Sequence, residues 1–99
     1  MEINLKTLKF DADQKLVDYV NKKVARLERF FPAGGEQLAE VTLSLGKSPD
    51  NKQAKIQTHI PGADLVIERE SQTFEQAITD CVDAMKEKLT RAKEKLYEK

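Results

Sequence analysis

This chain of 99 residues has one cysteine, one histidine and no long apolar run. The single cysteine, Cys81, excludes an internal disulfide and fits a reducing cytoplasm. No run approaches the roughly 20 apolar residues of a membrane span, and the first residues do not form a signal peptide. Without a repeat, a linker or a low-complexity tract, we expect one cytoplasmic domain over residues 1–99 with a single modest core.

The residue types that carry catalysis or bind metals do not gather in this sequence. His59 is the only histidine, and no cysteine or acidic metal-binding pattern accompanies it, so we interpret it as a solvated strand residue. Cys81 falls on an apolar helical stripe and is interpreted as a buried, inert thiol. Gly34-Gly35 lacks a phosphate-loop pattern and is interpreted as a turn. We therefore expect no enzyme activity, no cofactor, no metal and no small-molecule substrate.

Four stretches alternate between apolar and polar residues and are predicted to be strands. In the first, Ile3 and Leu5 are followed by a change of phase to Leu8 and Phe10, which predicts a bulge or bend near Thr7. The others lie around residues 41–45, 54–60 and 65–70. Short turns, including one at residues 61–62, predict that these three strands form an antiparallel meander.

Two segments carry apolar residues at helical spacing. The first is predicted to run from Gln14 to Arg29, with Asp11 and Asp13 as candidate N-caps. The second begins after Thr73, which forms a capping box with Gln76, and is predicted to continue to the chain end. Their apolar stripes are Leu16, Val20, Val24, Leu27 and Phe31 in the first, and Phe74, Ile78, Cys81, Met85, Leu89, Ala92 and Leu96 in the second.

The order of elements is therefore βαβββα, an α+β fold. Because each strand has one apolar face and each helix one apolar stripe, we expect both helices to pack on one face of a four-stranded sheet. The other face is expected to meet water; it would carry Asn4, Lys6, Thr42, Ser44, Lys55, Gln57, His59 and Glu68.

Positive charge is concentrated although the chain is neutral, with 17 Lys and Arg against 17 Asp and Glu. The cations gather toward the C-terminal ends of the two predicted helices. If the helices lie side by side, their basic flanks can border one groove that binds the phosphates of a nucleic acid. The candidate RNA-binding residues are Lys22, Lys23, Arg26, Arg29, Lys86, Lys88, Arg91, Lys93 and Lys95.

Other interpretations of this charge pattern stay open. Charged helix flanks are commonly solvated surface, and cations near helix C-termini also stabilise the helix dipole. A protein-binding modulator would instead use the acidic outer ridge of the last helix or the exposed sheet. Tyr19 lies within the basic band, where it can stack on a base or pack partly into the core.

The chain resembles a known family, the ribosome hibernation-promoting factors, also called ribosome-associated translation inhibitors. Residues 24–31, VARLERFF, are similar to the family's KLEKYF-like end of the first helix. Residues 88–96, KLTRAKEKL, are similar to its QLxKxKxKL ending, and Ala77-Ile78 matches its AID segment. The likeness covers nearly the whole chain and includes the order of elements.

This resemblance implies a fold like that of double-stranded RNA-binding domains, and a function. Family members bind the small ribosomal subunit in the channel used by mRNA and tRNA, and they block translation in starved or resting cells. The basic positions of the first helix match Lys22, Arg26 and Arg29 here, and those of the last helix match Lys88, Arg91, Lys93 and Lys95. Long members carry a second, dimerising domain after the first. The 99 residues here match only the first domain, so the chain looks like the short type and is expected to be monomeric when free.

Overall fold

The computed structural model of the chain describes residues 1–33, 37–48 and 50–97. The turn predicted at Gly34 and Gly35 lies outside the described residues. In chain order, the elements are β1 (Glu2–Leu8), α1 (Gln14–Ala25), the 3₁₀ helix η1 (Glu28–Phe30), β2 (Leu38–Leu45), β3 (Lys52–Ile60), β4 (Ala63–Ser71) and α2 (Phe74–Tyr97). The predicted βαβββα order is confirmed.

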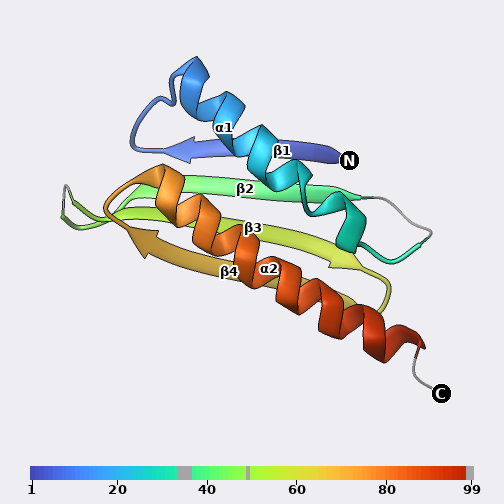
Figure 1. Cartoon of the computed structure of the whole chain (residues 1–99). Coiled ribbons are helices and arrows are strands. Elements are labelled where there is room, and N and C mark those ends of the chain that lie inside the picture. The colour runs from blue at the N-terminus through green and yellow to red at the C-terminus, as the bar shows by residue number, and fades with distance from the viewer. Residues whose placement is uncertain (34–36, 49, 98–99) are drawn as a thin grey trace.

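The four strands form one mixed sheet in the order β1-β2-β3-β4. β1 pairs with β2 in parallel, because α1 carries the chain back across the sheet between them. β2, β3 and β4 form the predicted antiparallel meander, and β3 and β4 are joined by the two-residue turn at Pro61-Gly62. Figure 1 shows both helices on the same face of this sheet, as predicted.

Of the bulge or bend predicted near Thr7, the bulge is absent and the bend lies further along the chain. β1 pairs with β2 without interruption from Glu2 to Leu8, and its side chains keep alternating along the whole strand. Leu8 therefore faces the open side of the sheet, where it is 42% exposed. The change of phase arises at Lys9, two residues after Thr7, where a φ of 72° turns the chain. Phe10 then returns to the helical side and stacks on Phe74, with ring centroids 4.5 Å apart.

The first helix is shorter than predicted, ending at Ala25 rather than Arg29. Beyond it the backbone tightens to i→i−3 hydrogen bonds, from Leu27 N to Val24 O at 2.9 Å and from Phe30 N to Leu27 O at 2.9 Å. Phe31 precedes a proline, and such residues avoid the α conformation; its φ and ψ are −73° and 145°. The 3₁₀ turn η1 therefore carries Arg29 and Phe30.

The helix N-termini are capped by side chains. Asp13, not Asp11, caps α1 by accepting a 2.8 Å hydrogen bond from Leu16 N. Thr73 accepts a 3.1 Å bond from Gln76 N ahead of α2, which confirms its predicted capping role. The side chain of Gln76 donates to Asp80 instead. Only the Thr73 half of the predicted capping box is therefore formed.

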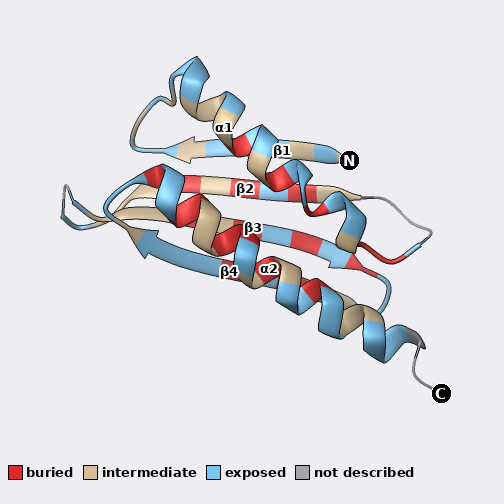
Figure 2. Cartoon of the chain, in the orientation of Figure 1, coloured by how far each residue is buried: buried red, intermediate tan, exposed pale blue. Residues whose placement is uncertain are grey.

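The core lies between the sheet and the two helices, where the buried residues face one another (Figure 2). The predicted stripes supply it: Val20, Val24 and Leu27 from the first, and Ile78, Cys81, Met85 and Leu89 from the second, are fully buried. Leu96, the last residue of the second stripe, is 41% exposed. The last turn of α2 therefore extends past the core. In the described part of the chain, no helix is long and apolar enough to cross a membrane.

Candidate nucleic-acid interface

The two helices run in the same direction across the sheet, so their C-terminal parts lie toward the same end of the molecule (Figure 1). α2 contacts both α1 and η1. Near the N-terminal end of α2, the hydroxyls of Tyr19 and Thr79 hydrogen-bond at 2.9 Å. This bond identifies the flank of each helix that faces the other, and Tyr19 is half-buried there, which confirms its packing role.

The cationic segments meet at a groove between η1 and the second half of α2. The inter-helix groove, as we call it, has a volume of about 490 Å³ and is lined by Arg29, Phe30, Thr90, Lys93 and Glu94. The guanidinium carbon of Arg29 lies 5.2 Å from the centroid of the Phe30 ring. From α2, Nζ of Lys86 lies 5.8 Å from the same centroid. Three of the predicted cations, Arg29, Lys86 and Lys93, are thus brought together around one aromatic ring.

Three further predicted cations lie on α1 and its C-terminal cap. Lys23 is half-buried, and its Nζ lies 5.5 Å from the centroid of the Tyr19 ring, on the side of α1 that faces α2. Lys22 and Arg26 are exposed in the last turn of α1 and at its C-cap. At about 100° per residue, they share the flank of α1 that carries Tyr19. They extend the positive surface of the inter-helix groove along α1.

The other three predicted cations do not face the groove. Lys88 lies on the opposite flank of α2, where its Nζ donates a 3.1 Å hydrogen bond to Val66 O of the edge strand β4. Lys95 lines a shallow hollow beside the turn at Pro61-Gly62. Arg91 is exposed and pairs with Glu87 at 2.6 Å. The nine cations therefore form a groove-side set and a β4-side set, separated by the outer surface of α2.

Few of the cations on the groove side are neutralised by carboxylates. Lys86 pairs with Asp83 at a long 3.9 Å. Within residues 1–33, 37–48 and 50–97, no ion pair is formed by Lys22, Lys23, Arg26, Arg29 or Lys93. Glu94 is the one carboxylate among the residues that line the groove, and it forms no ion pair with Arg29 or Lys93 in the described part of the chain. The field of these cations is therefore available to a polyanion, although the net charge of the whole chain is zero.

The sequence prediction missed Phe30 as a member of this site. The sequence held a signal for it. Phe30 and Phe31 are adjacent, only one of them can continue the apolar stripe, and the other must lie nearer the surface. The structure buries Phe31 at 6% exposure and leaves Phe30 half-buried. Its position against Lys86 and Lys93, more than fifty residues away in sequence, arises only from the packing of α2 on η1.

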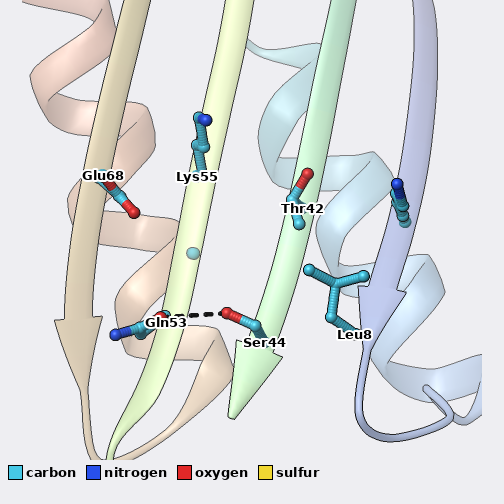
Figure 3. Close-up of a pocket in the computed structure, with 8 residues that line it drawn as sticks. Leu8, Thr42, Ser44, Gln53, Lys55 and Glu68 are labelled. Atoms are coloured by element: carbon cyan, nitrogen blue, oxygen red, sulfur yellow. Dashed lines mark hydrogen bonds between the residues drawn. The ribbon is translucent and has the colours of Figure 1, made fainter. Parts of the chain in front are cut away.

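The open face of the sheet is a second candidate surface (Figure 3). A hollow of about 330 Å³ there is lined by residues of all four strands, among them Lys6, Thr42, Lys55 and Glu68. Ser44 donates to Gln53 at 3.1 Å, as the dashed line in Figure 3 marks. Lys55 lies opposite Glu68 in the pairing of β3 with β4, so the positive field of this hollow is weaker for a polyanion than that of the inter-helix groove.

His59 and Cys81 lie where the sequence predicts them, on the open sheet face and in the core. His59 is exposed on the open sheet face and pairs with the equally exposed Asp64. Cys81 is fully buried, its Sγ lies 3.2 Å from Ala54 O, and burial raises the pKa of the thiol to about 12. Among the residues that the structure describes, no group of three or more His, Cys, Asp or Glu is arranged to hold a metal ion.

The sequence and the fold match proteins already known. Residues 3–97 match the family described as sigma 54 modulation protein / S30EA ribosomal protein. A ribosome hibernation promoting factor from Azotobacter vinelandii is 27% identical over 99 residues, which cover this whole chain and 89% of that protein. The crystal structure of the Protein Y N-terminal domain from Thermus thermophilus is 33% identical, with a TM-score of 0.80 over 93% of this chain and 99% of that one.

A ribosomal subunit interface protein from Coxiella burnetii shares the fold at 18% identity, with a TM-score of 0.78 over 94% of this chain and 98% of that one. The family match spans nearly every residue of the two-layer domain described above. The chain therefore belongs to the sigma 54 modulation protein / S30EA ribosomal protein family, which confirms the resemblance to the ribosome hibernation-promoting factors. This is a family of ribosome-associated factors.

Proposed function

We propose that this protein is a hibernation factor that binds the small ribosomal subunit through rRNA, in the channel that mRNA and tRNA use. By occupying the channel it inhibits translation sterically in resting or starved cells. It acts in the cytoplasm as a single domain over residues 1–99, monomeric when free, and without catalysis, cofactor or small-molecule substrate.

The observation that carries this proposal is the convergence of Arg29, Lys86 and Lys93 at one groove, although the net charge is zero. Cations that are not neutralised by nearby carboxylates attract phosphates, and the release of counterions from the RNA drives such binding. Lys22, Lys23 and Arg26 extend this surface along α1. Lys88, Arg91 and Lys95 offer a second line of contacts on the far side of α2.

Phosphate contacts fix the position of a protein on RNA without reading its sequence. A rigid two-layer domain with cations on both sides of one helix therefore recognises a folded RNA surface by shape and charge. The protein-binding alternative would use the acidic outer ridge of α2 or the open sheet face. The hollow on that sheet face has Lys6, Lys55 and Glu68 in its lining, and it has no cluster of cations comparable to that of the groove among the described residues.

The test is a competition on the small subunit. Subunits are loaded with this protein, mRNA and initiator tRNA are added, and each component is measured after sedimentation. Steric inhibition predicts that the protein and the tRNA exclude each other, and that excess tRNA restores initiation. Binding of both together without displacement would refute the blocking mechanism. Failure of the protein to sediment with subunits at all would refute rRNA binding and favour a protein partner.

A further inference from the structure

We propose that the half-buried ring of Phe30 is a stacking surface for one unpaired nucleobase, with Arg29, Lys86 and Lys93 placed to bind the phosphates beside that base. This inference rests on the proposed binding to rRNA. It specifies which local feature of the RNA the inter-helix groove binds: an unstacked nucleotide and not a continuous duplex.

The ring of Phe30 packs against the edge of the core but is only half-buried there. Its neighbour Phe31 is the one that fills the apolar stripe, at 6% exposure. Phe10, half-buried at the other end of the helical layer, stacks on the buried ring of Phe74. Among the rings whose side chains the structure describes, Phe30 has no aromatic partner. It therefore keeps an aromatic surface that a planar ligand can contact.

The space beside the ring fits such a ligand. The inter-helix groove has a volume of about 490 Å³, within the range of roughly 300–1,000 Å³ that is typical of small-molecule pockets. Phe30 and the aliphatic stems of Arg29 and Lys93 line it. Stacking of bases on aromatic side chains is the usual way in which proteins hold unpaired nucleotides, because every base has a flat π surface.

The cations lie where the phosphates of a stacked nucleotide would pass. The groups of Arg29 and Lys86 are 5.2 Å and 5.8 Å from the ring centroid, so the ring holds both of them near its faces. When a base takes the place of either cation on the ring, that cation remains within reach of the phosphate attached to the base. Lys93 contributes a third positive charge on the opposite wall.

Glu94 determines which way a nucleotide is oriented in the groove. A carboxylate repels phosphate but accepts hydrogen bonds from exocyclic amino groups, such as N4 of cytosine. The edge of the base is therefore expected to face Glu94, with the phosphates toward Arg29 and Lys86. Thr90, whose hydroxyl donates to Lys86 O at 2.8 Å, has its oxygen lone pairs left to accept from the same edge.

The first experiment uses the absence of tryptophan from this chain. A Phe30→Trp variant carries a single indole in the groove, and a Leu8→Trp variant carries one on the open sheet face as a matched control. Both are titrated at low salt with short single-stranded oligocytidylate and with long duplex RNA. We expect the single strand to quench the fluorescence of Phe30→Trp strongly, while the duplex quenches it little and Leu8→Trp responds to neither. Equal quenching by strand and duplex, or none by either, would overturn the inference.

The second experiment measures binding to small subunits. Phe30→Leu keeps apolar packing but removes the π surface, whereas Phe30→Tyr keeps both. Since one stacked base contributes about 1–3 kcal/mol, Phe30→Leu is expected to weaken binding roughly 5- to 150-fold, and Phe30→Tyr to bind like the parent. Thermal denaturation checks that both variants remain folded.

The two proposals fail in distinguishable ways. If the parent and Phe30→Leu bind subunits equally, stacking is refuted while rRNA binding stands. If the parent does not bind subunits but oligocytidylate still quenches Phe30→Trp and not Leu8→Trp, the stacking site stands and the ribosomal function is refuted.

Discussion

The hydroxyl of Tyr19 on α1 lies 2.9 Å from Oγ1 of Thr79 on α2, so one hydrogen bond between residues 60 positions apart in sequence joins the two helices. Thr79 donates its own hydroxyl proton to Glu75 O at 2.9 Å. The Tyr19 hydroxyl must therefore be the donor in the bond between the helices. Because Lys23 lies over the Tyr19 ring, the same side chain also orients a cation beside α2.

Tyr19→Phe is expected to lower the free energy of unfolding by about 1 kcal/mol, because it removes this half-buried bond and keeps the ring. Thr79→Val removes the acceptor and the bond to Glu75. A double-mutant cycle measured by urea denaturation should show a coupling of about 0.5–1.5 kcal/mol between the two positions. Strictly additive effects would show that the bond contributes nothing to stability.

The capping role of Asp13 can be tested against its neighbour Asp11, since both are exposed acidic residues ahead of α1. Asp13→Ala leaves Leu16 N without its acceptor and is expected to cost about 1 kcal/mol of stability. Asp11→Ala should change stability by less than about 0.5 kcal/mol. Denaturation midpoints of the two variants decide the matter, and equal losses would contradict the assignment of the cap.

Charge reversal in the inter-helix groove should weaken ribosome binding more than the same reversal elsewhere. Arg29→Glu with Lys93→Glu changes the groove, and Lys6→Glu with Lys55→Glu changes the open sheet face. Each pair takes the net charge from 0 to −4, because each substitution removes one positive charge and adds one negative charge. The control therefore matches total charge.

We expect the groove pair to lose most of its binding to small subunits and the sheet pair to lose little. The slope of log affinity against log salt should fall by roughly 0.7 to 0.9 for each phosphate contact that is lost. Circular dichroism should be unchanged in both pairs, since all four side chains lie outside the core. Equal losses in the two pairs would show that only net charge matters.

The buried thiol of Cys81 makes stability depend on alkaline pH. Burial raises its pKa from 9.0 to about 12, so the folded protein keeps the proton longer than the unfolded chain does. This contribution is fully present below pH 9 and is lost as the pH rises from 9 through 12. The free energy of unfolding of the parent should therefore fall relative to that of Cys81→Ala across this window. A difference between the two proteins that is constant with pH would contradict it.

The sequence by itself determined the order of elements, the faces of the strands and the buried stripes of the helices. Alternating and helical periodicities record which side of each element avoids water, and this is a local property of the chain. Val20, Val24, Leu27 and Met85 were all predicted on this ground to lie on apolar stripes, and all four are fully buried. The nine candidate cations were likewise found from local clustering of charge.

Only the tertiary structure decided where α1 ends, where β1 turns and which cations share a groove. A 3₁₀ turn before Pro32 and a positive φ at Lys9 depend on energies too small to read from periodicity alone. The groove depends on α2 packing against η1, which places Lys86 and Lys93 beside Phe30 but sends Lys88 to β4. Periodicity gives the flank of one helix, but the partner that this flank meets is set by contacts between residues far apart in the chain.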